Sequence, residues 1–114
     1  MGNTVSLQRE VCVRFGARFL EAPDESTLGI ALPTIGSLPL NGLRHPPDRG
    51  TSGWFVWAGE TLSDDPEFFV PMHVSHLRDE CPEVLPYLGL EPGWRFLLAP
   101  GYEDVWFDES LLHA

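Results

Sequence analysis

The sequence predicts a single α+β domain in which an N-terminal helix and a central helical segment pack on a mostly antiparallel sheet of roughly four or five strands. Three observations lead to this prediction. The chain has 114 residues, which is the length of one domain. Apolar residues make up 43 % of it, enough to form a core. They show helical spacing near the start and short β-type runs later, with Pro and Gly between the runs.

The first 16 residues are expected to hold the N-terminal helix, from Thr4 to Phe15. Apolar residues recur there at helical spacing. Asn3 or Thr4 can cap the first turn, and Gly16 can adopt the left-handed conformation that ends a helix. This segment therefore predicts one amphipathic helix that covers part of the sheet.

The segment that follows the helix is less regular. Ala17–Glu21 is compatible with a short strand, and Thr27–Leu32 with a longer one that ends at a proline. Gly36–Gly53 is the least regular stretch, because it is rich in proline and because Asn41-Gly42 is typical of a turn. An irregular stretch of this length in a compact domain is often functional.

Residues 53–112 form the best-defined module. Gly53–Gly59 is apolar on both faces, which predicts a central strand covered on both sides. Met72–Glu80 is expected to be helical, and Pro82 is placed to begin a second short helix. Gly89 can stop that helix.

The clearest prediction is a hairpin near the end of the chain. Trp94–Ala99 and Glu103–Phe107 are β-type runs joined through Pro100-Gly101. Together with the central strand and the helix, these runs supply the expected core. We expect six side chains to be largely buried: Trp54, Val56, Leu77, Phe96, Leu98 and Val105.

The charge of the chain limits its partners. Seventeen acidic residues against seven basic ones give a net charge of −10, and all the basic residues are Arg. Such a surface repels a phosphate backbone, so we expect no nucleic-acid partner, whereas a basic protein would be attracted. The alternative is that the acidic residues only keep the protein soluble. No apolar run is long enough to span a membrane and no signal peptide is evident, so we expect a cytoplasmic protein.

The two cysteines, Cys12 and Cys81, are far apart in sequence and have neither metal nor redox spacing. One long-range disulfide is the only bridge they could form. Two buried thiols in a reducing compartment are the favoured interpretation.

The strongest metal-like signal is His73-x-x-His76. On a helix these imidazoles would share a face and could reach one ion, with Cys81 or His45 as further ligands. A small metal-binding enzyme or accessory domain is therefore the alternative function. Capping or core hydrogen bonding explains the same residues without a metal, and we assign no metal ligand and no cofactor.

Nothing in the sequence predicts catalysis by a nucleophile or by acid–base residues. Ser75 and Cys81 lack the local motifs of known nucleophiles, and no Gly-rich phosphate loop is present. We therefore assign no catalytic residue and expect a protein that is not an enzyme.

Acidic residues beside aromatic ones are typical of protein-binding surfaces, although a buried aromatic core with an acidic rim gives the same pattern. Two such groups stand out, one after the central strand and one at the hairpin. The predicted partner-binding residues are Asp64, Asp65, Glu67, Phe69, Tyr102, Glu103 and Asp104.

Several motifs between residues 53 and 112 resemble a known bacterial family. They are Gly-Trp-Phe-Val-Trp-Ala-Gly-Glu, Asp-Asp-Pro-x-Phe-Phe, Pro-Met-His-Val-x-His-Leu and Gly-Tyr-Glu-Asp-Val-Trp-Phe-Asp. The upstream run Leu-Asn-Gly-Leu-Arg-His-Pro-Pro is also similar. The chain resembles the immunity protein thirty-three-like domain family from about residue 28 onward. The resemblance implies a protein that protects a cell from a polymorphic toxin by binding its cognate toxin. It carries over no catalytic residue.

Overall fold

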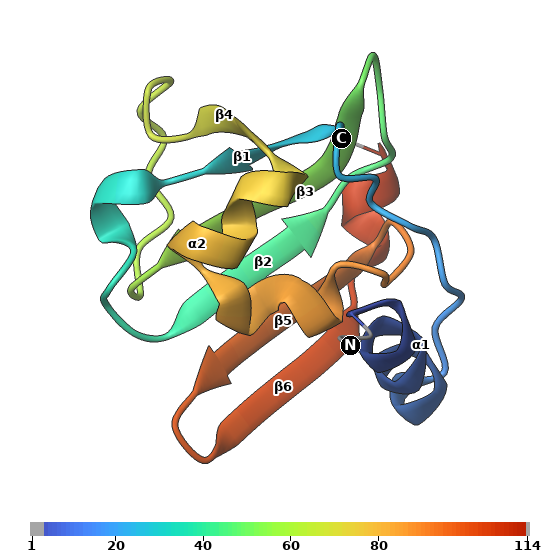
Figure 1. Cartoon of the computed structure of the whole chain (residues 1–114). Helices are drawn as coiled ribbons and strands as arrows, with labels where there is room; N and C mark the ends of the chain where they lie inside the picture. The colour runs from blue at the N-terminus through green and yellow to red at the C-terminus, as the bar shows by residue number, and fades with distance from the viewer. Residues whose placement is uncertain (1–3, 114) are drawn as a thin grey trace.

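Six strands form one sheet in the order β4-β1-β3-β2-β5-β6 in the computed structural model, which describes residues 4–113 (Figure 1). The strands are Thr27–Ile30 (β1), Leu40–Arg44 (β2), Thr51–Ala58 (β3), Val70–His73 (β4), Trp94–Ala99 (β5) and Tyr102–Phe107 (β6). The β1–β3 pair is parallel and the other pairs are antiparallel. The α+β class and the mostly antiparallel sheet are confirmed, but the sheet is mixed and larger than expected.

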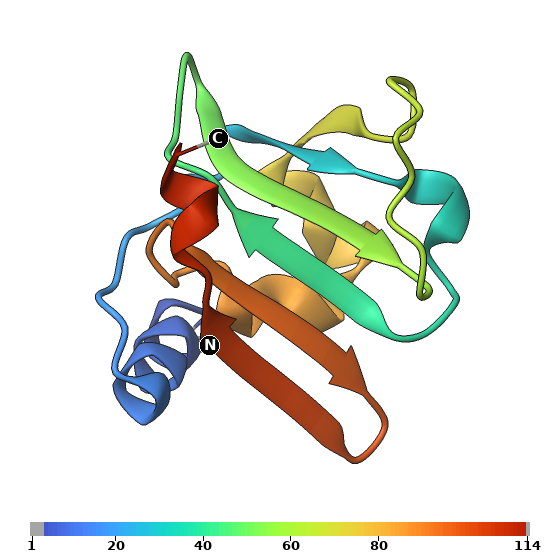
Figure 2. The same ribbon diagram turned by 180° about the vertical axis from the view of Figure 1, so that it is seen from behind.

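Helices cover both faces of this sheet unequally. The helices are Thr4–Phe15 (α1), Leu77–Glu80 (α2) and four 3₁₀ segments, Leu32–Thr34 (η1), Val74–His76 (η2), Pro82–Tyr87 (η3) and Glu109–His113 (η4). We call the face covered by α1, α2 and η3 the helix face. The other, which we call the open face, carries η4, whose Leu111 belongs to one cluster with Leu43 of β2 and Trp57 of β3 (Figure 2). None of the helices within residues 4–113 is long and apolar enough to cross a membrane.

The main core lies between the sheet and the helix face. Five of the six predicted core side chains are buried there, namely Trp54, Val56, Leu77, Phe96 and Val105. Leu98 is half-buried and packs against the same cluster. A smaller cluster on the open face contains the side chains that β3 directs to its other side. The central strand is therefore covered on both sides, as predicted.

The first helix and the hairpin are confirmed with the expected bounds or within one residue of them. Helix α1 spans Thr4–Phe15 and ends at Gly16, whose φ of 77° is left-handed. Asn3, the other expected cap, lies outside the described residues. Strands β5 and β6 pair from Ala99↔Tyr102 at the turn to the far end without a break.

Strand β2 corrects the prediction that Gly36–Gly53 is irregular and that Asn41-Gly42 is a turn. The pair lies inside an inner strand, where β2 joins β3 to β5. The Asn41 amide donates to the carbonyls of Pro39, Trp57 and Gly59, so it stabilises the strand where a turn was expected. Gly42 is required because the ring of Phe96 lies directly over it.

The expected helix over Met72–Glu80 is wrong in its first half. Met72 and His73 pair with Leu28 and Thr27 at the sheet edge, and the chain then passes through η2 into a single turn of α-helix. Backbone pairing with β1 outweighs the helical pattern there.

The expected strand over Ala17–Glu21 is reduced to one isolated bridge, Phe19↔Leu90. The carbonyls of Leu20 and Glu21 accept hydrogen bonds from the Arg44 side chain instead of from a neighbouring strand.

Arg44 is fully buried at the end of β2. Its guanidinium donates to the carbonyls of Ser52, Leu20, Leu88, Leu90 and Glu21 at 2.7–3.3 Å. Burial lowers the pKa of this side chain to about 10, which still leaves it charged at neutral pH. One side chain thus links the sheet to two connecting segments of the helix face.

Candidate functional site

The acidic loop between β3 and β4 projects into solvent. Asp64, Asp65 and Glu67 are all exposed. The Asp65 carboxylate accepts the backbone N–H of Glu67 at 2.9 Å, and the Asp65 N–H donates to the hydroxyl of Ser63 at 3.0 Å. These local bonds order the loop, because a side chain that bonds its own backbone forms an Asx turn. The loop therefore presents its negative charge from a defined conformation.

Phe69, the aromatic residue among the predicted partner-binding residues of this loop, is half-buried and packs on the open face. Its ring centroid lies 5.1 Å from Phe55, 6.1 Å from Trp57 and 4.9 Å from Phe68, all with edge-to-face geometry. Its exposed side remains available, while the rest of the ring holds the loop to the sheet.

An apolar groove runs over the open face beside Phe69. It consists of two adjoining hollows of about 240 and 550 Å³, which share Thr51, Gly53 and Phe55. The first extends to Phe69 and to Pro71 on β4, and the second to η4. A concave apolar surface of this size suits a partner side chain or a short segment.

Strand β6 divides its side chains between the two faces. Val105 lies in the main core, so Glu103 shares the helix face, whereas Tyr102, Asp104 and Trp106 lie on the open face. Tyr102 is 56 % exposed and Trp106 is half-buried. The hairpin therefore adds one acidic and two aromatic side chains to the open face.

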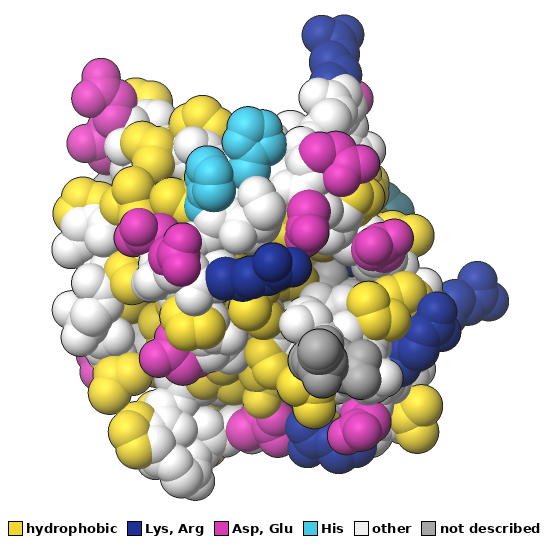
Figure 3. Space-filling view, viewed as in Figure 1, with side chains coloured by type: hydrophobic (Ala, Val, Ile, Leu, Met, Phe, Trp, Pro, Cys, Tyr) yellow, Lys and Arg dark blue, Asp and Glu magenta, His cyan; other side chains and the backbone are white. Residues whose placement is uncertain are grey.

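The seven predicted residues do not form one continuous rim. The acidic loop leads into β4 and the hairpin contains β6, and these are the opposite edges of the sheet (Figure 2). Phe69, Tyr102 and Asp104 share the open face, while the side chain of Glu103 is on the helix face. On the helix side, Figure 3 shows acidic side chains scattered among apolar ones, with no single acidic patch.

Glu103 joins α1, β6 and η3. Its carboxylate accepts two hydrogen bonds from Arg14, both at 3.0 Å, and one from the Tyr87 hydroxyl. Hydrogen bonds from Arg14 and then Tyr87 lower the pKa of Glu103. Burial, followed by the adjacent Glu103 carboxylate, raises the pKa of Tyr87 to about 12. The side chain of Glu103 is therefore occupied by contacts within the protein.

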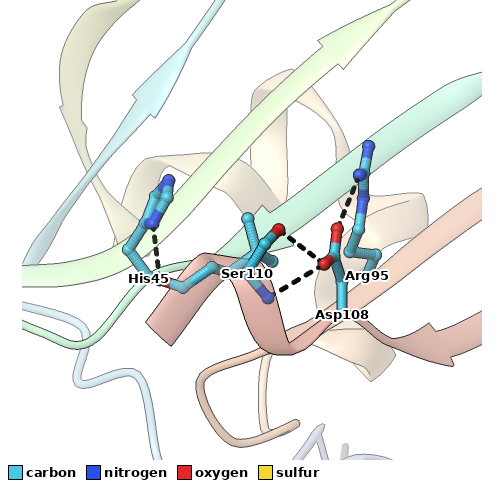
Figure 4. A network of polar contacts seen from close by, with 5 residues as sticks. His45, Arg95, Asp108 and Ser110 are labelled. Carbon is cyan, nitrogen blue, oxygen red and sulfur yellow. Dashed lines mark hydrogen bonds and ion pairs between the residues drawn. The ribbon is translucent and has the colours of Figure 1, made fainter. Parts of the chain in front are cut away.

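A polar network holds η4 against the open face (Figure 4). Asp108 accepts from Arg95 at 3.2 Å and from the hydroxyl of Ser110 at 2.6 Å, and the Nδ1 of His45 lies 3.0 Å from the Leu111 carbonyl oxygen. Bonds from Ser110 and then Arg95 lower the pKa of Asp108. The imidazole contacts a backbone carbonyl and not the serine, so the geometry is that of a structural clasp, not of a nucleophile and base.

This clasp was not predicted from the sequence. Asp-x-Ser before a short helix is nevertheless a recognisable capping pattern that could have indicated it. The Asp108 carboxylate also accepts the N–H of Ser110 at 3.1 Å, as that pattern implies.

The two histidines of the metal hypothesis do not share a helical face. His73 ends β4 and His76 ends η2, and their ring centroids are 5.7 Å apart. Between residues 4 and 113, no three His, Cys, Asp or Glu side chains are grouped so that they could hold a metal ion. The i, i+3 argument behind that hypothesis therefore does not apply to this fold.

Cys12 and Cys81 are free thiols, and both are buried. The Cys12 sulfur donates to the Gly89 carbonyl at 3.4 Å. Burial raises the pKa of both thiols, that of Cys81 to about 11 with a further contribution from Glu83. The thiolate is the reactive form, so both side chains are protonated at neutral pH and shielded.

We expect neither thiol to react with a disulfide reagent in the native protein within minutes at pH 7.5. In denaturant, both should be modified at once. A spectrophotometric thiol count with and without guanidinium tests this. Rapid labelling of either cysteine in the folded protein would contradict its burial, and a serine variant of the other cysteine would show which one reacted.

Comparison with known proteins gives one family. The model of the Imm33-like domain matches residues 7–108, which is most of the chain. No curated protein and no solved structure matches the chain.

Proposed function

Because the chain belongs to the Imm33-like domain family, we propose that it is a non-enzymatic immunity protein that binds and neutralises a bacterial protein toxin in the cytoplasm. The family match over residues 7–108 is the observation that carries this proposal. The cognate toxin is the proposed partner, and neither a nucleic acid nor a membrane is part of the proposal.

The polar side chains of the fold support binding over catalysis. Arg44, Asn41 and Asp108 each accept or donate several hydrogen bonds that join secondary-structure elements. Groups used in this way hold a surface rigid, and a rigid surface loses little conformational entropy on binding.

We place the contact surface on the open face. Its apolar groove would receive side chains of the toxin, and its exposed aromatic rings would act as anchors. Carboxylates lie at both edges of this face. Six strands at about 4.8 Å spacing make this face about 24 Å wide, which lets a partner lie across several strands. The proposed contact residues are Asp64, Asp65, Glu67, Phe69, Tyr102 and Asp104, with Glu103 at the β6 edge.

The charge of the chain favours a basic toxin. A net charge of −10 accelerates encounter with a positive partner, and salt screens that attraction. The association rate should therefore be high at low ionic strength and should fall markedly as the salt concentration rises.

Co-expression with the toxin encoded beside this gene tests the proposal. Wild type should restore growth and co-purify with the toxin. Replacing Asp64 and Asp65 by Ala should slow association several-fold, because long-range attraction acts on the encounter. Tyr102→Ala should speed dissociation about tenfold or more, because it removes an exposed aromatic side chain that the complex would bury.

The matched control replaces Asp79 and Glu80 by Ala, which makes the same charge change at exposed positions on the helix face. That variant should bind much more like wild type than the loop variant does. If wild type neither rescues growth nor co-purifies, the immunity proposal fails. If all variants bind like wild type, the function stands and the proposed surface is wrong.

A further inference from the structure

The two edges of the sheet differ in their ability to accept another strand. Strand β4 is only four residues long and contains Pro71, which has no N–H to donate. Proline on an edge strand is a common protection against unwanted pairing. Strand β6 is six residues long, contains no proline, and pairs with β5 in unbroken register. The β6 edge is therefore the open one.

The hydrogen-bonding groups on this edge follow from the ladder. The N–H of Asp108 donates to the Gly93 carbonyl at 2.7 Å, so Asp108 faces β5. In an antiparallel pair alternate residues face the partner, so Glu103, Val105 and Phe107 face outward. These three residues present three N–H and three C=O groups, and none of them has a hydrogen-bond partner within residues 4–113.

The side chains along this edge define what would pair with it. Tyr102 and Phe107 are 56 % and 46 % exposed, one on each face of the strand. Asp104 is exposed and forms no ion pair among the described residues, whereas Glu103 is already held by Arg14. A pairing strand would therefore meet an unneutralised carboxylate on the open face and apolar surface on both.

We propose that the outer edge of β6 binds a basic β-strand of the toxin as a seventh strand of the sheet. This inference rests on the proposed function and names its recognition mode. Backbone hydrogen bonds supply the pairing, an Arg or Lys faces Asp104, and apolar side chains pack beside Tyr102 and Phe107. Charge selects this occupant over a second copy of the chain, because two copies at −10 each repel.

A pair of variants at one position separates the backbone from the side chain. Glu103→Ala and Glu103→Pro both remove the carboxylate and the contact with Arg14. Only the proline variant also loses the outward N–H, and neither loses a bond to β5. Glu103→Pro should weaken toxin binding at least tenfold more than Glu103→Ala does, with similar melting temperatures. Phe107→Ala and Phe107→Pro repeat the comparison if Glu103→Pro does not fold.

A second measurement does not need the toxin. The probe is the peptide Arg-Val-Arg-Val-Arg at millimolar concentration, with Glu-Val-Glu-Val-Glu as the matched control. Hydrogen exchange followed by NMR should show the outward amides of Glu103, Val105 and Phe107 exchanging quickly in the free protein. The basic peptide should slow all three, and the acidic peptide should slow none.

Each outcome decides between the two proposals. If the toxin binds but the proline and alanine variants bind equally, the edge inference is overturned and the immunity function stands. If the peptide protects these amides but the toxin does not bind, the edge accepts a basic strand, but the proposed function fails and the toxin is not the source of that strand. If neither the peptide nor the toxin protects them, the edge inference is overturned. Concentration-dependent dimers that protect the same amides would also overturn it, in favour of a second copy.

Discussion

Replacing Arg44 by Met is expected to lower the free energy of unfolding by about 3–5 kcal/mol. The methionine fills a similar volume but donates no hydrogen bond. Five carbonyl groups that now accept from the guanidinium would lose this partner, and three of these hydrogen bonds, those to Ser52, Leu88 and Leu90, are fully buried. A buried polar group without a partner costs about 1–3 kcal/mol, and removal of an unpaired buried charge offsets part of the sum.

Urea unfolding of the variant measures this loss. Arg18→Met, at an exposed position, is the control and should change stability by less than about 0.5 kcal/mol. Arg44→Lys should recover part of the loss, since an ammonium group has three donors but not the planar fork. A loss below about 1 kcal/mol for Arg44→Met would show that the carbonyls find water or other partners.

The parts of the fold that local pattern determines were predicted from the sequence. Helix α1 has a continuous apolar stripe and a glycine stop, and the β5–β6 hairpin has a turn between two β-type runs. Strand β3 is apolar on both faces because both faces are covered. In each case the signal lies within the element itself.

Strands β2 and β4 could not be predicted in this way, because their signals come from other parts of the chain. Asn41-Gly42 has turn chemistry, but the Asn41 amide bonds to Trp57 of β3 and to Gly59 just after it, and the missing side chain of Gly42 accommodates Phe96 of β5. Likewise, Pro71 disfavours a strand unless the strand lies at an edge. Only the order of the strands in the sheet shows that β4 lies at an edge.

The same distinction applies to the candidate site. Composition was enough to predict exposed acid at the loop and the hairpin, and Asp64, Asp65 and Asp104 are indeed exposed. Their separation to opposite edges follows from a crossover that places β4 beside β1, and β2 between β3 and β5. The sequence contains no local trace of that order, although the alternation of side chains along the predicted Glu103–Phe107 strand does imply that Glu103 and Asp104 face opposite sides of the sheet.

Phe96→Ala is expected to lower the free energy of unfolding by about 3–5 kcal/mol through the cavity that it leaves. The ring is 1 % exposed and is held between Trp54 and Tyr87, with centroids 5.5 and 5.2 Å away. A loss below about 1 kcal/mol would mean that the neighbours collapse into the space or that this side of the sheet is not core.

Gly42 provides an internal test of that packing. A Cβ at this position would overlap the ring of Phe96, which its neighbours prevent from moving, so Gly42→Ala alone should cost about 1–3 kcal/mol. In the double variant the new methyl group occupies space that the ring has vacated. The two losses should then be less than additive by about 0.5–3 kcal/mol, as measured by a double-mutant cycle in urea. Additive losses would show that Gly42 and Phe96 are not in contact, and the register of β2 against β5 would then be wrong at its centre.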